Sequence, residues 1–189
     1  MPIDLKRALL FTIKEAGNHA LCRTAVQKLL YFEQELRIVD TEFKPYYYGP
    51  YSVEVAGSLQ SLAGLDFIDE NASCIKWNSN SQSPNWVRYG YSVTKDGEEV
   101  IGSLEAIESD AFKKISSLVK IVRSTAGLDQ RILSCAAKIH FIVKRESRPM
   151  QRSEIVECAK GLGWNLTASE IDAAVVLLQE LGLVEAATH

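Results

Sequence analysis

The chain has 189 residues, which is long enough for one larger domain or two small ones to bury a core. A hydrophobic fraction of 47% and a charged fraction of 24% are typical of a soluble globular protein, and no run approaches the roughly eighteen apolar residues of a membrane-spanning helix. The net charge of −3 does not indicate a nucleic-acid partner. The N-terminus lacks the pattern of a secretory signal, so we expect a cytoplasmic protein that does not bind membranes.

Charge is unevenly distributed along the chain. Residues 113–152 contain ten basic and two acidic residues, a net charge of +8, so the rest of the chain carries −11. Such a stretch can contact phosphates, or it can face the acidic remainder of the same protein or of a partner. The basic residues are Lys113, Lys114, Lys120, Arg123, Arg131, Lys138, Lys144, Arg145, Arg148 and Arg152.

The four cysteines, Cys22, Cys74, Cys135 and Cys158, are far apart and form no C-x-x-C pair. In a protein without a secretory signal we expect them to be reduced and mostly buried thiols.

The chain begins with two expected helices. Apolar residues recur every three or four positions over 5–16 and predict a helix that ends near Gly17. Thr24 and Gln27 have the spacing of a capping box, in which two side chains satisfy the free amides of a helix start. The second helix therefore begins there and presents an apolar face over 26–36.

The run KPYYYGPYS at 44–52 comes next. Tyr46–Tyr48 favour an extended strand, because aromatic side chains pack well on a pleated surface, and Gly49-Pro50 ends it. Ser52 is then the expected N-cap of a third helix over 53–63. The run can be a packed aromatic corner or a recognition surface.

Short strands are expected after the third helix. Residues 65–70 have the pattern of one strand, and 73–77 and 86–93 have the pattern of a hairpin joined by the polar loop 78–84. Helix, helix, strand, helix and hairpin in this order predict a winged helix-turn-helix domain over residues 1–94.

Thr94 then begins a predicted long connecting helix over 95–126, with Asp96 and Glu98 at its positive end. Its near-heptad apolar stripe can be a coiled-coil seam between the subunits of a homodimer, or it can lie over the protein's own core.

A third part covers residues 127–189 and is expected to contain helices near 132–143 and 153–162. A further helix begins at Thr167, which forms a second capping box with Glu170. Its ending, LLQELGLVEA, echoes LQSLAGLDFIDE at the end of the third helix. The expected fold is therefore mainly α with a small β-hairpin (α+β), in which a second, smaller helical module of winged-helix type follows the long helix.

Four segments of the first hundred residues resemble a known family. QKLLYF at 27–32, FKPYYYGPYS at 43–52, the pattern LxxLxGLxFI at 59–68 and YSVTKDGEEV at 91–100 occur in the order and spacing of YwgA-like proteins and of the related Panacea-type antitoxin domain. The resemblance implies a non-catalytic, winged-helix-like domain in regulatory, toxin–antitoxin or defence-associated settings. It does not imply a defined ligand.

No catalytic or metal-binding pattern is present in the sequence. There is no phosphate-binding loop and no nucleophile elbow, and the pair Cys22 and His19 lacks an orienting carboxylate. Glu33 and Glu35 are expected on solvated faces. We therefore predict a protein that is not an enzyme and has no cofactor. The histidines, His19, His140 and His189, are well separated.

Nucleic-acid binding requires basic groups on the helix that would enter the major groove. The helix at 53–63 carries none, and the helix at 168–181 is acidic. The candidate binding residues therefore lie around the aromatic run, the hairpin and the basic stretch, although they can equally be ordinary solubilising charges. They are Lys28, Lys44, Tyr46, Tyr48, Tyr51, Ser52, Lys76, Arg88, Lys95, Lys113, Lys114 and Lys120.

Two functions follow from this pattern. In the first, a dimeric winged-helix regulator of transcription binds double-stranded DNA through its wing and the basic stretch. In the second, an antitoxin-like module engages a protein partner, a toxin or defence component, through its tyrosines and its charge polarity. The winged-helix pattern places the first slightly ahead.

Overall fold

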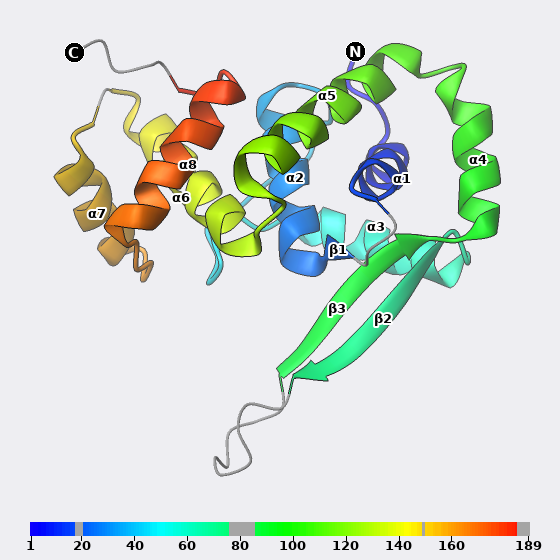
Figure 1. Ribbon diagram of the computed structural model, residues 1–189, viewed down its shortest axis with the longest axis horizontal. Coiled ribbons are helices and arrows are strands. Elements are labelled where there is room, and N and C mark those ends of the chain that lie inside the picture. The colour runs from blue at the N-terminus through cyan, green and yellow to red at the C-terminus, as the bar shows by residue number, and fades with distance from the viewer. Residues whose placement is uncertain (18–20, 76–85, 149, 185–189) are drawn as a thin grey trace.

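The computed structural model of the protein describes residues 1–17, 21–75, 86–148 and 150–184, and within the sheet it leaves out the side chains of residues 73–75 and 86–88. This part of the chain contains eight helices and a three-stranded antiparallel sheet (Figure 1). The expected mainly helical α+β class is confirmed. None of these helices is long and apolar enough to cross a membrane.

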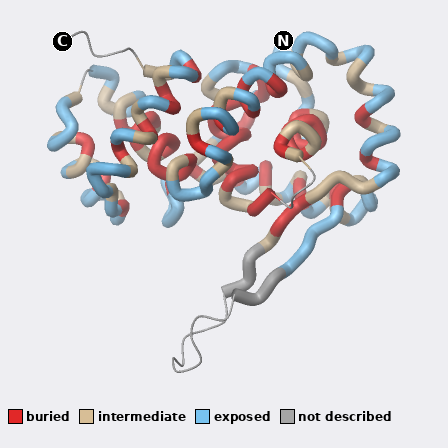
Figure 2. Tube along the Cα trace, viewed as in Figure 1, coloured by how far each residue is buried: buried red, intermediate tan, exposed pale blue. Residues whose placement is uncertain are grey.

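Helices α1 (Leu5–Glu15) and α2 (Arg23–Glu35) lie at the centre of the fold and are buried over most of their length (Figure 2). The expected capping box is wrong: Cys22 is the N-cap residue of α2, and no side chain caps the helix. Gln27 instead points into the protein, where it makes contacts with a distant loop. A local pairing within the first turn has been replaced by a tertiary one.

Helix α2 also carries a buried acid, Glu33, for which the expectation of a solvated face was wrong. Thr12 Oγ1 donates a hydrogen bond of 2.6 Å to Glu33 Oε1, whereas Glu33 Oε2 has no partner among the described residues. Burial raises the pKa of this carboxyl to about 8, although the hydrogen bond from Thr12 opposes the shift.

The aromatic run forms a turn and not a strand, so this prediction is wrong. Two backbone hydrogen bonds join Lys44 to Tyr51 and two more join Tyr46 to Gly49, which places Tyr47 and Tyr48 at the tip of a tight loop. Gly49 has a φ of +99°, a conformation that closes such a turn and that other residues rarely adopt. We call residues 44–51 the tyrosine loop.

Helix α3 (Val53–Gly64) starts directly after this loop. Its expected N-cap is confirmed: Ser52 Oγ accepts a hydrogen bond of 3.3 Å from the Val55 amide. Val55, Leu59 and Leu62 form its buried face.

The sheet has the strand order β1-β3-β2, with β1 (Leu21–Cys22), β2 (Ile68–Ile75) and β3 (Trp86–Val93). The two strands expected before position 78 are one strand, β2, and residues 65–67 form a turn in which Asp66 has a positive φ. The β2–β3 hairpin projects away from the helices (Figure 1). The expected polar loop at 78–84 lies outside the described residues.

The expected long helix is broken into α4 (Lys95–Glu105) and α5 (Ser109–Ala126). The amides of Ile107 and Glu108 both bond the carbonyl of Leu104, which ends α4 in a tight turn. The two helices then follow the outside of the core at an angle (Figure 1). The apolar stripe of α5 is buried against the protein's own helices α1 and α8. This favours the interpretation that the stripe lies over the protein's own core and not in a coiled coil between subunits.

The chain ends in three described helices, α6 (Gln130–Glu146), α7 (Arg152–Gly161) and α8 (Ala168–Glu180). The capping box of Thr167 and Glu170 at the start of α8 is confirmed. Between positions 127 and 184 the structure describes no strand. Helix α6 packs on α2 and α8 packs on α5, so these helices share one hydrophobic core with the N-terminal part.

Candidate functional site

A groove of about 1370 Å³ lies between the two halves of the fold. Its walls come from α2, the tyrosine loop, the first residues of α3, helix α6 and the segment before α8. We call it the central groove. Five of the candidate residues line it: Lys28, Lys44, Tyr46, Tyr48 and Tyr51.

The tyrosines of the loop are exposed. Tyr46, Tyr47 and Tyr48 keep 64%, 70% and 47% of their surface accessible, and Val53 at the start of α3 keeps 78%. The rings of Tyr47 and Tyr48 contact edge to face at 4.8 Å between centroids. Large aromatic side chains with free surface are thus gathered on one short loop.

The backbone that carries these tyrosines is fixed from both halves of the fold. Trp164, a buried residue between α7 and α8, donates an indole hydrogen bond of 2.8 Å to the Tyr46 carbonyl. Gln27 bonds both the amide and the carbonyl of Ser52 at 2.9 Å. Loop and helix start are therefore held by side chains distant in sequence.

Ser52 is fully buried and serves as a cap. Its hydroxyl lies 3.0 Å from Thr41 Oγ1, and Thr41 in turn donates to Glu54 Oε2 at 2.6 Å. Ser52 therefore supports the loop from within and offers no surface to a ligand.

Lys28 lies at the floor of the central groove and is 2% exposed. Its ammonium donates a hydrogen bond of 2.6 Å to the Pro50 carbonyl and forms no ion pair with a described carboxylate. Burial, and secondarily the charge of Lys138, lower its pKa to about 7.

Lys138 extends from α6 into the same groove, where its ammonium lies 5.6 Å from the centre of the Trp164 ring. Burial lowers its pKa, although the charge of Glu170 acts in the opposite direction. Gly49 lies against both lysines: a Cβ at this position would be 3.1 Å from Lys138 Cγ and 3.5 Å from Lys28 Nζ. The absence of a side chain here lets the two lysines approach the loop.

The acidic residues of the groove already have polar partners. Glu42 pairs with Lys44 at 3.4 Å. Glu54 accepts from Thr41, and Glu170 accepts from the Thr167 amide and hydroxyl, bonds that lower the pKa of Glu170. The described lining carries five basic and three acidic side chains, so basic groups are in excess there.

No protein-family model matches the chain, and no curated protein is significantly similar to it. The resemblance to YwgA-like proteins therefore stays a prediction from the four segments that carry it.

The other candidate residues lie outside the central groove. Lys95 is exposed at the start of α4, and Lys113, Lys114 and Lys120 are exposed on α5. Lys76 and the side chain of Arg88 lie outside the described residues.

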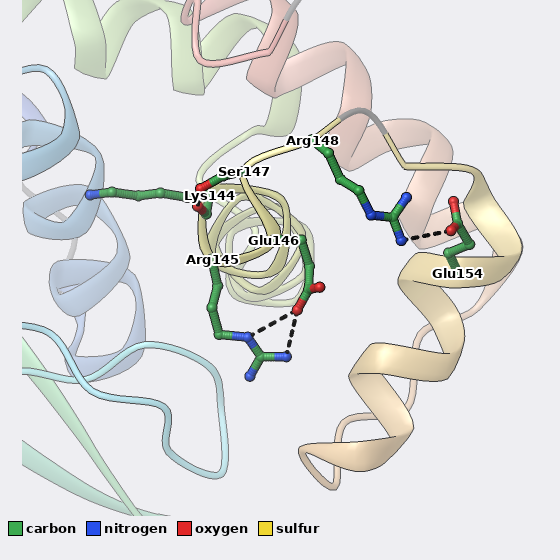
Figure 3. Close-up of polar contacts among 6 residues, drawn as sticks. All are labelled: Lys144, Arg145, Glu146, Ser147, Arg148 and Glu154. Atoms are coloured by element: carbon green, nitrogen blue, oxygen red, sulfur yellow. Dashed lines mark hydrogen bonds and ion pairs between the residues drawn. The ribbon is translucent and has the colours of Figure 1, made fainter.

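Four of the ten basic residues of the basic stretch form ion pairs among the described residues. At the end of α6, Arg145 pairs with Glu146, and Arg148 reaches across to Glu154 of α7 at 2.7 Å (Figure 3). The remaining pairs of this kind are Lys144 with Glu35 and Arg152 with Asp172.

Sequence reasoning missed Gln27, Lys138 and Trp164 as site residues. Lys138 counted only as one charge of the basic stretch, although Cys135 and Ile142, three residues before it and four after it, share its face of the helix and were a signal that it is half-buried. Nothing in the sequence near Trp164 indicates that it bonds the tyrosine loop, because that contact spans 118 positions.

The thiol of Cys135, which lines the groove, is not activated. Burial raises the pKa of the Cys135 thiol to about 12, which leaves it protonated and unreactive at neutral pH. His140 is buried and its Nδ1 lies 2.8 Å from the Tyr31 hydroxyl. Over the described ranges, no three potential metal ligands come together. The arrangement is suited to binding.

Proposed function

We propose that the protein is a non-catalytic regulatory module of winged-helix type that binds a protein partner through the tyrosine loop and the central groove, as an antitoxin-like protein would. The observation that carries the proposal is the tyrosine loop, in which three exposed aromatic rings stand on a backbone fixed by Trp164 and Gln27.

The order α1-β1-α2-α3-β2-β3 and the strand order β1-β3-β2 support the winged-helix assignment. In this arrangement α3 occupies the place of a DNA-recognition helix. Its exposed positions, Val53, Glu54, Gly57, Gln60 and Gly64, carry no positive charge. A surface without cations is poorly suited to a phosphate backbone and better suited to another protein.

The chemistry of the loop supports a protein partner. Tyrosine buries a large ring at low entropic cost while its hydroxyl keeps a hydrogen bond, which is why it is frequent among residues that dominate binding energy. A fixed backbone reduces the ordering cost of association further.

Binding of double-stranded DNA is the second candidate. The projecting β2–β3 hairpin and the exposed lysines of α5, Lys113, Lys114 and Lys120, support it. In this alternative a dimer contacts phosphates with the hairpin and these lysines, and α3 contributes little.

The two functions are separated by paired variants of the full chain. Tyr47→Ser with Tyr48→Ser removes the rings but keeps the backbone bonds of the loop, and Lys113→Glu with Lys114→Glu reverses charge on α5. We expect affinity capture from the native host to yield a protein that the tyrosine variant loses and the lysine variant retains.

A mobility shift with random duplex DNA over a salt series completes the test. Capture that survives in the tyrosine variant, together with a salt-dependent shift that the lysine variant loses, would overturn the proposal in favour of DNA binding.

A further inference from the structure

The Lys28 ammonium has an incomplete set of partners. An ammonium group has three donors, and among the described residues Lys28 uses one of them, in the 2.6 Å bond to the Pro50 carbonyl. It is nevertheless 2% exposed, and buried charges in proteins are normally paired. Because Lys28 lines the central groove, its other two N–H donors are available to a group bound there.

A second cation lies beside the first. Lys138 enters the groove from α6, and both lysines approach the Cβ position of Gly49 to within 3.5 Å. Neither lysine forms an ion pair with a described carboxylate. The positive charge of Lys138 disfavours the protonated form of Lys28. Glu170 acts on Lys138 from a distance but makes no ion pair with it, so the repulsion between the two lysines is not cancelled, and an anion placed between them would remove this cost.

The size of the groove indicates what kind of anion fits. Its volume of about 1370 Å³ exceeds the roughly 300–1,000 Å³ of typical small-molecule sites. The groove is walled by the aromatic rings of Tyr46, Tyr48 and Tyr51, and Arg131 of α6 adds an exposed cation to its lining. An extended peptide with acidic and apolar side chains matches these walls better than a small ion does.

We propose that the central groove binds an acidic peptide segment of the partner, with one carboxylate held by Lys28 and Lys138. The inference rests on the proposed function for the partner being a protein. It adds the chemistry of the bound segment and the two residues that anchor it.

Carboxylate binding restores the charge of Lys28, so above neutral pH the complex takes up a proton that the free protein lacks. Apart from Lys28 and Lys138, the charged and titratable groups that face the groove come from β1, α2, the tyrosine loop and the residues before it, α3, β3, α6 and the start of α8. They are Cys22, Arg23, Glu42, Lys44, Tyr46, Tyr48, Tyr51, Glu54, Tyr89, Arg131, Cys135 and Glu170. Lys28 is the residue of this groove whose pKa is lowered to about 7, so we expect its protonation to change on binding at pH 8.

The test uses the full chain and a capped decaglutamate peptide as the probe, with inorganic phosphate as a second arm. Isothermal titration at pH 8 in two buffers of different ionisation enthalpy gives affinity and proton uptake together. We expect the peptide to bind with proton uptake. Lys28→Met and Lys138→Met should each weaken binding at least tenfold, and Lys28→Met should abolish the uptake. Lys113→Met, an exposed lysine outside the groove, is the matched control and should change neither.

Three results would overturn the inference: no peptide binding at millimolar concentration, equal binding by Lys28→Met and the unaltered protein, or phosphate binding that the peptide does not displace. The last result would assign the site to a small anion. Partner capture that depends on Tyr47 and Tyr48 but not on Lys28 would overturn the role of Lys28 as an anchor and leave the proposed function intact. Partner capture that depends neither on Tyr47 and Tyr48 nor on Lys28 would overturn both the proposed function and this inference.

Discussion

Replacement of Lys28 by methionine should stabilise the free protein, although it removes a hydrogen bond. Below neutral pH, Lys28 is charged in the folded and the unfolded chain, and folding removes that charge from water. A pKa lowered from 10.5 to about 7 corresponds to a cost on the order of 5 kcal/mol. Loss of the bond to the Pro50 carbonyl offsets roughly 1–2 kcal/mol of this. The variant should therefore be roughly 3–4 kcal/mol more stable at about pH 6.

The pH dependence makes this prediction specific. Because the pKa of Lys28 is depressed in the folded protein, its contribution to stability is present above the unfolded value of 10.5 and is lost as pH falls through about 7. Between these limits the advantage of the variant should shrink by about 1.4 kcal/mol for each pH unit of increase. Urea denaturation from about pH 6 to pH 10, followed by circular dichroism, measures it, with Lys113→Met as a control that stays within about 0.5 kcal/mol. An advantage that does not change with pH, or a variant less stable at pH 6, would refute the claim that Lys28 is a buried cation without a counter-ion.

Three further predictions concern the loop and the core. Gly49→Ala should lower the free energy of unfolding by about 1–3 kcal/mol, because φ is +99° and the new methyl group would press on Lys138. Urea denaturation measures this change, and an unchanged midpoint would contradict the turn geometry. Glu33→Gln should remove part of the pH dependence of stability. The raised pKa of Glu33 stabilises the folded protein fully below 4.5, and this contribution is lost as pH rises through about 8, so the variant should gain on the order of 3 kcal/mol over the unaltered protein between pH 5 and pH 8 in thermal or urea melts. A gain that is equal at both pH values would count against a protonated carboxyl. Trp164→Phe removes the donor to the Tyr46 carbonyl, so it should lower the free energy of unfolding by about 1 kcal/mol and speed amide hydrogen exchange in the tyrosine loop. Unaltered exchange would show that the indole hydrogen bond does not hold the loop.

Local signals in the sequence predicted local structure correctly. Ser52 and Thr167 cap their helices because an N-cap needs only a short polar side chain and the amides of the next turn. The β-hairpin ending at Val93 was found because alternating apolar residues predict a strand with little help from the rest of the chain.

Three of the failures share one physical cause, which is a tertiary contact that outweighs a local preference. Tyr46–Tyr48 have strand propensity, but the positive φ of Gly49 and the bond from Trp164 hold them in a turn. Gln27 fits a capping box, but it satisfies the buried backbone of Ser52 instead. Burial of Glu33 likewise depends on Thr12, which lies 21 positions earlier in the chain.

The candidate site was predicted in part for the same reason. The tyrosines and Lys28 lie in or near one conspicuous run of sequence, so they were singled out. Lys138 joins them only because α6 packs on α2, and no pattern within α6 shows which helix it will contact.

The central claim is that the tyrosine loop is the surface that a protein partner covers. Site-specific photo-crosslinking in the native host tests it most directly, with p-benzoylphenylalanine placed at position 47 in the loop or at position 113 on α5. Both positions are exposed, so the probe reports contact and not folding. The account predicts a discrete protein adduct from position 47 and none from position 113. Adducts from position 113 alone would contradict it.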